Sequence, residues 1–121
     1  MAYMLLIMEE PGERLAPPPD ERRRRWDVMM AFAGELEANG KLRTANALAL
    51  PSRDTVRLGK RCRGTGALDG PFAEAKEIVG GFFYLDVDTR EEAVAIAEQC
   101  PAVTWSTVEV RKIAPCFEDT Q

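Results

Sequence analysis

The chain has 121 residues, of which 45% are hydrophobic and 30% charged, and this predicts one globular domain with a hydrophobic core. Its formal net charge of −4 argues against a nucleic acid as main partner, because phosphate binding needs a basic surface. The absence of histidine excludes histidine triads, histidine metal sites and an imidazole general base. Any acid–base chemistry therefore has to use Asp, Glu, Lys, Tyr or Cys. We expect no metal and no cofactor.

The cysteines and the N-terminal segment indicate the cellular compartment of the protein. Cys62, Cys100 and Cys116 are widely spaced and form no C-x-x-C motif, which indicates free thiols in a reducing compartment. The apolar run from Tyr3 to Met8 is too short to span a membrane, and no basic signal-peptide segment precedes it. We expect a cytoplasmic protein with no membrane partner.

The first half of the chain begins with a predicted strand over residues 2–8, in which both faces are apolar. A proline-rich loop over residues 9–19 leads into a helix over about residues 20–39, which ends at Gly40. The helix carries one apolar stripe, formed by Trp26, Met29, Met30, Ala33 and Leu36. Residues 41–50 are predicted to form a second strand.

Four consecutive arginines, Arg22 to Arg25, lie near the start of this helix. Consecutive helical residues point in different directions, so the four guanidinium groups do not form one patch. We expect a solvated helix turn, or pairing with the carboxylates of Glu9, Glu10 and Glu13. An anion site is the less favoured alternative.

The second half predicts a β-hairpin over residues 55–68 with Gly59 in its turn, followed by a strand over residues 82–87. Glycines inside a strand, here Gly80-Gly81, indicate a bulge or the close approach of another backbone or a ligand. Thr89 and Glu92 form a capping box that begins a helix over about residues 90–100.

The chain closes with an alternating strand over residues 106–113 and a loosely held tail over residues 115–121. We treat residues 1–121 as one domain with its core in residues 1–114. Without the hairpin the order is βαββαβ, an α+β fold of the ferredoxin-like class with two helices on one face of an antiparallel sheet.

The sheet face without helices is predicted to be apolar, because the first strand is apolar on both sides. We expect a homodimer in which two such faces pack together into a dimeric α/β barrel. Counting back by twos from Val87 assigns the side chains of residues 79–87 to the two faces. The helix-covered face receives Val79, Gly81, Phe83, Leu85 and Val87, and the open face receives Phe82 and Tyr84.

The open face is the predicted ligand site. Its aromatic Phe82 and Tyr84 lie with the charged Glu109 and Arg111 of the last strand, a combination typical of small-molecule sites. An equally favoured alternative is that Glu109 and Arg111 pair across the dimer interface.

The segment DGPFAEAKE at residues 69–77, followed by GGFFYLDVD and a capped helix, resembles the YCII-related superfamily in its DGPF-domain branch. The likeness extends over most of the chain, from the opening strand AYMLLI to the closing strand VEVRKI. It implies a dimeric α/β barrel of ferredoxin-like subunits.

The resemblance also implies that one branch of the family is enzymatic and has a His–Asp pair in a cleft. That branch includes a dehydrochlorinase that acts on a chlorinated hydroxyquinol. That histidine falls near Met29 of this chain, and a methionine cannot move a proton.

Three functions stay open. The first is a lyase or isomerase acting on a small anionic or phenolic compound in a pocket between the open face and the DGPF loop. Asp69 is then the base, Tyr84 or Lys76 the acid, and Arg111 the anion holder. The predicted ligand-binding residues are Phe72, Lys76, Phe82, Tyr84, Glu109 and Arg111.

A structural role for Asp69 is favoured over the catalytic one, because its carboxylate can cap the amide of Phe72 or Glu74 in a turn that contains Pro71. The second function is a non-catalytic ligand-binding or regulatory dimer that uses the same pocket. The third is an interaction module whose apolar face only dimerises.

Overall fold

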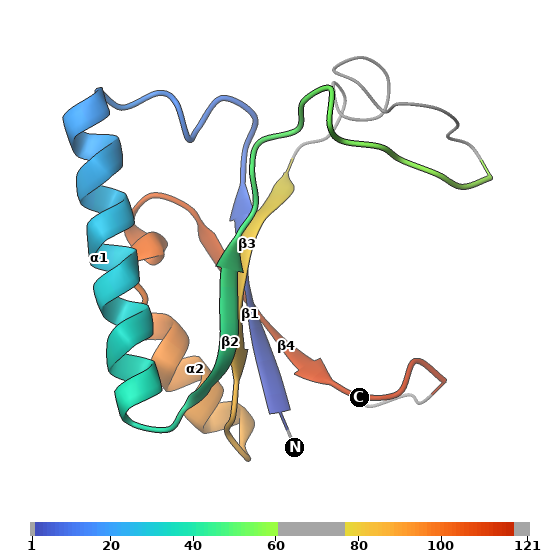
Figure 1. Ribbon diagram of the computed structural model, residues 1–121. Helices are drawn as coiled ribbons and strands as arrows, with labels where there is room; N and C mark the ends of the chain where they lie inside the picture. The colour runs from blue at the N-terminus through green and yellow to red at the C-terminus, as the bar shows by residue number, and fades with distance from the viewer. Residues whose placement is uncertain (1, 61–76, 118–121) are drawn as a thin grey trace.

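The computed structural model describes residues 2–60 and 77–117. The elements are β1 (Ala2–Glu9), α1 (Pro19–Ala38), β2 (Leu42–Ala47), β3 (Ile78–Leu85), α2 (Arg90–Gln99), the 3-10 helix η2 (Pro101–Thr104) and β4 (Thr107–Ile113). The strands form one sheet in the order β2-β3-β1-β4, and every neighbouring pair is antiparallel. Both α-helices lie on one face of this sheet, at the left in Figure 1. The arrangement is the small α+β fold that the order of elements predicts, and it is consistent with the ferredoxin-like class.

Within the described residues, no helix is both long enough and apolar enough to cross a membrane.

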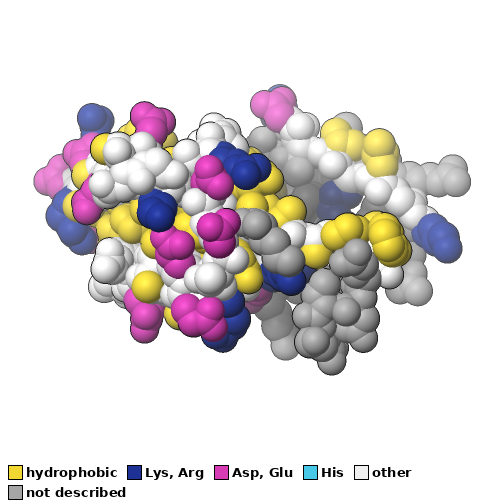
Figure 2. All heavy atoms as spheres, turned by 90° about the horizontal axis from the view of Figure 1, so that it is seen from below, with side chains coloured by type: hydrophobic (Ala, Val, Ile, Leu, Met, Phe, Trp, Pro, Cys, Tyr) yellow, Lys and Arg dark blue, Asp and Glu magenta, His cyan; other side chains and the backbone are white. Residues whose placement is uncertain are grey.

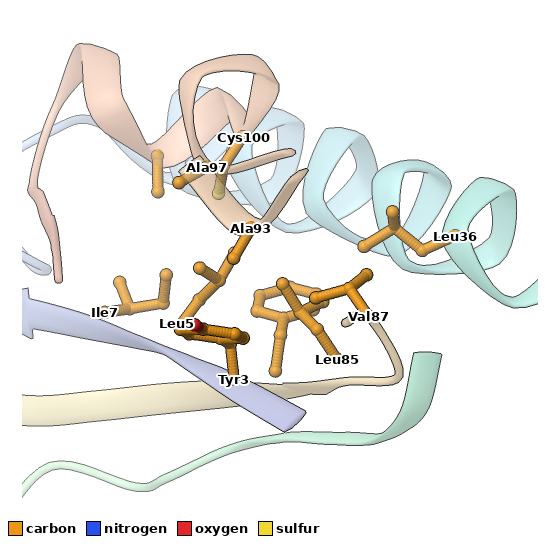
Figure 3. Close-up of a cluster of buried hydrophobic side chains, with 11 residues drawn as sticks. Tyr3, Leu5, Ile7, Leu36, Leu85, Val87, Ala93, Ala97 and Cys100 are labelled. Atoms are coloured by element: carbon orange, nitrogen blue, oxygen red, sulfur yellow. The ribbon is translucent and has the colours of Figure 1, made fainter. Parts of the chain in front are cut away.

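The hydrophobic core lies between the helices and the sheet (Figure 3). Leu5 of β1 and Leu85 of β3 have no exposed surface. The small residues Ala93 and Ala97 let α2 pack closely on the strands, as predicted. Cys100 is also fully buried in this core, and burial raises the pKa of its thiol.

A β-bulge at Gly80 changes which side chains of β3 face the helices. Ile7 pairs with Gly81 and Met8 pairs with Val79, so Gly80 is the extra residue between them. The predicted faces therefore hold after the bulge, where Phe83 is buried, and reverse before it. Val79 is 40% exposed, and its assignment to the helix-covered face was wrong for this reason.

The open face carries the side chains that the pairing of the strands places opposite one another. Leu6 of β1 lies between Phe82 of β3 and Glu109 of β4. The row beside it joins Met4 to Tyr84 and Arg111. Val108 and Val110 of β4 pack instead against the core, which confirms the predicted alternation of that strand.

The predicted first arm of the hairpin, residues 55–58, forms no strand. Val56 and Leu58 are 51% and 80% exposed, so the segment has no buried side on which strand pairing could be stabilised. This part of the hairpin prediction was wrong. The second arm, residues 61–68, lies outside the described residues.

The helix ends follow the expected chemistry. Gly40 takes a φ of 70° after α1, a conformation that glycine adopts without strain. At the start of α2 the hydroxyl of Thr89 accepts a hydrogen bond of 3.1 Å from the amide of Glu92. The carboxylate of Glu92 lies 2.6 Å from the ammonium of Lys41 and raises its pKa, and among the described residues no return bond to Thr89 completes the capping box.

Acidic and basic side chains are interspersed over the helical half of the molecule in Figure 2, which shows the end nearest the N-terminus. The Lys41–Glu92 pair joins the strand and helix ends of this region. This end of the protein is therefore a mixed-charge surface and not a patch of one sign.

Candidate functional site

A cavity of about 510 Å³ lies between α1 and the helix-covered face of the sheet. Small residues stand on both sides of it, so the helix and the strands approach without filling the space between them. These small lining residues are Ala33 of α1, Ala45 and Ala47 of the β2 strand, Gly80 and Gly81 of β3, and Ala102 of η2. The volume is within the range of pockets that hold small molecules.

Large apolar side chains form the walls of the cavity. Trp26 and Met30 come from α1 and Leu15 from the loop that precedes it, and they are 50%, 51% and 56% exposed. Trp105 forms a further part of the lining. Phe83 on the sheet side meets Phe32 edge to face, with 5.4 Å between the ring centroids, which holds this wall in place.

An ion pair in the floor of the cavity holds the loop between β1 and α1. The side chain of Glu9 is only 10% exposed, and Arg14 donates to both of its oxygens, from Nε at 3.0 Å and from Nη2. Arg14 also donates from Nη1 to the carbonyl of Leu48 at 2.8 Å, and from Nη2 to the carbonyl of Gly80 at 3.3 Å. One side chain therefore joins the loop to the end of β2 and to the bulge of β3.

Glu13 holds the same loop from its other side. The hydroxyl of Ser106 donates to Oε1 of Glu13 at 2.9 Å, and the amide of Glu10 donates to Oε2 at 2.7 Å. The loop is thus hydrogen-bonded to the start of β4 as well as to β2 and β3. Its side chains close one side of the cavity in a defined position.

Of the two arrangements predicted for the four arginines, a solvated helix turn or pairing with distant carboxylates, the structure excludes the second, because three of the arginines pair within α1. Within the described residues, Arg24 and Arg25 both pair with Glu21, and Arg23 pairs with Asp27. The two guanidinium groups lower the pKa of Glu21 to about 2. The predicted pairing with Glu9, Glu10 and Glu13 was wrong, because Arg14 from the loop reaches Glu9 first and Glu13 turns to Ser106.

Two of these arginines line the cavity. The guanidinium of Arg25 lies 4.9 Å from the ring centroid of Trp105, in a cation–π contact. Arg22 also lines the cavity, and its Nε is buried with no hydrogen-bond partner in the described part of the protein.

The predicted site residues divide between three places. Asp69, Phe72 and Lys76 lie outside the described residues. Tyr84, Glu109 and Arg111 lie on the open face of the sheet, away from the cavity. Phe82 shares the pairing row of the open face and also borders the cavity.

The charged groups of the open face have partners within this chain. Nη1 of Arg111 lies 3.2 Å from Oε2 of Glu109, which is two residues away on the same strand. The guanidinium of Arg43 lies 5.2 Å from the ring centroid of Tyr84 and 3.4 Å from a carboxylate oxygen of Asp86. A ligand site on this face, or a pairing across a dimer interface, stays a prediction.

Comparison with known proteins identifies the family. The profile of the YCII-related domain matches residues 1–116. The chain belongs to the YCII-related family. A search of curated proteins found no match. Met29 is one of the residues that line the cavity of this YCII-related chain. It is the residue near which the sequence resemblance implies the histidine of the enzymatic branch.

A solved structure has the same fold as this YCII-related chain. It is 5-chloro-2-hydroxyhydroquinone dehydrochlorinase from Burkholderia phenoliruptrix, in complex with 2,5-dihydroxybenzoquinone. The TM-score is 0.54, the sequences are 14% identical, and the match covers 94% of each chain. At this identity the likeness shows the fold alone.

Proposed function

We propose that this YCII-related chain binds a small, largely apolar and planar molecule in the cavity beneath α1, without converting it. The observation that carries the proposal is the position of three large apolar side chains. Leu15, Trp26 and Met30 are each about half exposed, and all three line this one cavity. Apolar surface gathered in one concave place is typical of a ligand site.

The ionisable groups of the cavity favour binding over catalysis. Those of the described residues are Glu9, Glu13, Arg14, Arg22 and Arg25. Arginine does not give up a proton in proteins, and the oxygens of both carboxylates already accept hydrogen bonds that hold the loop. Met29 contributes no proton-transfer group at the place where the resemblance implies one.

Filling the cavity from α1 tests the proposal. We expect 2-naphthalenemethanol, a neutral planar probe, to bind the wild type, and Ala33→Phe to weaken this binding about tenfold or more by occupying the same volume. Isothermal titration calorimetry measures both affinities.

The matched control is Ala31→Phe, which adds the same side chain at an exposed position of the same helix that does not line the cavity. The proposed function fails if neither this probe nor 2-naphthoate, which has the same rings, binds the wild type, or if the two phenylalanine variants weaken binding equally.

A second candidate is an acid–base enzyme acting on a phenolic compound, as a lyase or isomerase. The fold likeness to a dehydrochlorinase favours it, and Asp69, Lys76 and Tyr84 keep their predicted roles as base and acids in this alternative. Incubation with 5-chloro-2-hydroxyhydroquinone and measurement of released chloride separates the two candidates. Chloride release above the uncatalysed rate supports the enzyme.

We also propose that the open face of the sheet joins two chains into a homodimer. The apolar side chains of Met4, Leu6 and Phe82 lie across the two central strands of this face, and within the described residues no helix covers them. Sedimentation equilibrium at micromolar concentration is expected to give twice the chain mass of 13.5 kDa.

Leu6→Lys places a charge at the centre of this face and is expected to give a monomer. Ala31→Lys, on the exposed side of α1, is expected to leave the dimer intact. A wild type that sediments as a monomer contradicts the proposal.

A further inference from the structure

One polar group of the cavity is left without a partner. The Nε of Arg22 is buried, and no atom of the described residues accepts a hydrogen bond from it. Buried donors in native proteins nearly always have an acceptor. Because Arg22 lines the cavity, a ligand held there supplies that acceptor once the side chain turns its Nε–H edge toward it.

The neighbouring charges do not satisfy Arg22. Arg14 is paired with Glu9, and Arg25 is paired with Glu21. Glu13, the remaining carboxylate of the lining, accepts its hydrogen bonds from an amide and a hydroxyl. Arg22 is therefore the guanidinium of the cavity with no carboxylate partner among the described residues.

We propose that the ligand of this cavity is an aromatic carboxylate and that Arg22 is the residue that recognises its acidic group. This rests on the proposed function. A guanidinium presents Nε–H and one Nη–H along a single edge, and a carboxylate accepts both in parallel. A neutral hydroxyl or a phenolate has one oxygen and cannot use this edge in the same way.

The rest of the lining specifies the aromatic part. Trp26, Trp105 and Phe83 present rings to the cavity, and Met29 and Met30 add apolar, adaptable surface. A planar ring system fits these walls, and its carboxylate then replaces the water that Arg22 loses on burial.

Two probes with the same rings test the inference by isothermal titration calorimetry at pH 7. The wild type is expected to bind 2-naphthoate about 10- to 100-fold more tightly than 2-naphthalenemethanol, because only the first accepts the charged pair of hydrogen bonds. Arg22→Met is expected to remove this preference, and to change the affinity for 2-naphthalenemethanol less than about twofold.

Two further variants isolate the role of the guanidinium. Arg22→Lys keeps the charge without the planar edge, and is expected to restore only part of the preference. Arg23→Met removes the neighbouring arginine, which pairs with Asp27 and does not line the cavity, and is expected to leave the preference intact.

The outcomes separate this inference from the proposed function. Equal affinity of the wild type for both probes, or the same loss in the Arg22 and Arg23 variants, overturns the role of Arg22 while binding in the cavity stands. Failure of both probes to bind overturns the proposed function and this inference together. If Arg22→Met does not fold, comparing the affinities of the wild type and of Arg22→Lys for the two probes still tests whether Arg22 recognises the carboxylate.

Discussion

Replacing Arg14 with methionine is expected to lower the free energy of unfolding by about 2–3 kcal/mol. The substitution leaves the carboxylate of Glu9 at 10% exposure without its cation, and it removes the donors to the carbonyls of Leu48 and Gly80. Removal of one partner of a buried pair typically costs 3–5 kcal/mol, and the 31% exposure of the Arg14 side chain places this case below that range. Urea denaturation of both proteins measures the difference.

A double-mutant cycle provides the control. Glu9→Met/Arg14→Met removes both charges together, so no ion is left buried without a partner, and its loss is expected to be smaller than the sum of the two single losses by about 1–3 kcal/mol. Single losses that simply add would contradict a direct interaction between the two side chains.

The same variant has a consequence for binding. Arg14 joins the loop of residues 10–18 to β2 and β3, and that loop carries Leu15 on one side of the cavity. The structure therefore links the stability of the loop to the shape of the cavity. A preformed wall of this kind reduces the entropy that a ligand loses on binding.

The elements of the fold were largely predictable because their signals are local. The unbroken apolar run of residues 3–8 identifies β1, and the alternation of residues 106–113 identifies β4 within one residue of its observed start. Residues 55–58 gave a misleading signal, because their alternation is not accompanied by burial. Local propensity cannot show which face of a segment has something to pack against.

The cavity was not predictable, because its position depends on contacts between distant parts of the chain. Arg14 donates to carbonyls 34 and 66 residues away, and these bonds fold the loop over the edge of the sheet. The sequence predicts the apolar stripe of α1 but not how much of it is covered, and only Leu36 of that stripe is buried. Trp26 and Met30 stay half exposed because small residues stand opposite them.

One sequence signal did point toward this region. The Gly80-Gly81 pair predicts a bulge or the close approach of another backbone or a ligand. Gly80 is the bulged residue, and a Cβ atom at Gly81 would lie 3.0 Å from the backbone oxygen of Asn46, so a bulge and a close backbone are both present. Arg22 was part of a run for which an anion site was the less favoured alternative. Arg22 and Arg25 are more buried than Arg23 and Arg24, and Arg22 differs from Arg25 in having no partner for its buried Nε among the described residues. Four identical letters cannot convey either difference.

Gly80→Ala is expected to destabilise the protein by about 2–4 kcal/mol. A Cβ atom at this position would lie 1.7 Å from Oε2 of Glu9 and 2.5 Å from its Cδ, and 2.9 Å from Nη2 of Arg14. The carboxylate cannot move aside cheaply, because Arg14 holds both of its oxygens and the surrounding strands bury it. The added methyl group must therefore separate the ion pair or open the bulge, and thermal and urea unfolding measure either outcome.

Gly34→Ala provides the matched control. Nothing lies within 4 Å of a Cβ at this position inside α1, so the same substitution is expected to stabilise the protein by up to about 1 kcal/mol through helix propensity. If Gly80→Ala has the same free energy of unfolding as the wild type, then the carboxylate of Glu9 can adopt another position. The ion pair would then not be what fixes the loop beside the cavity. A large loss at Gly80 with a gain at Gly34 shows that the space beside the bulge is reserved for Glu9, and that the glycine is required for its side chain to be buried there.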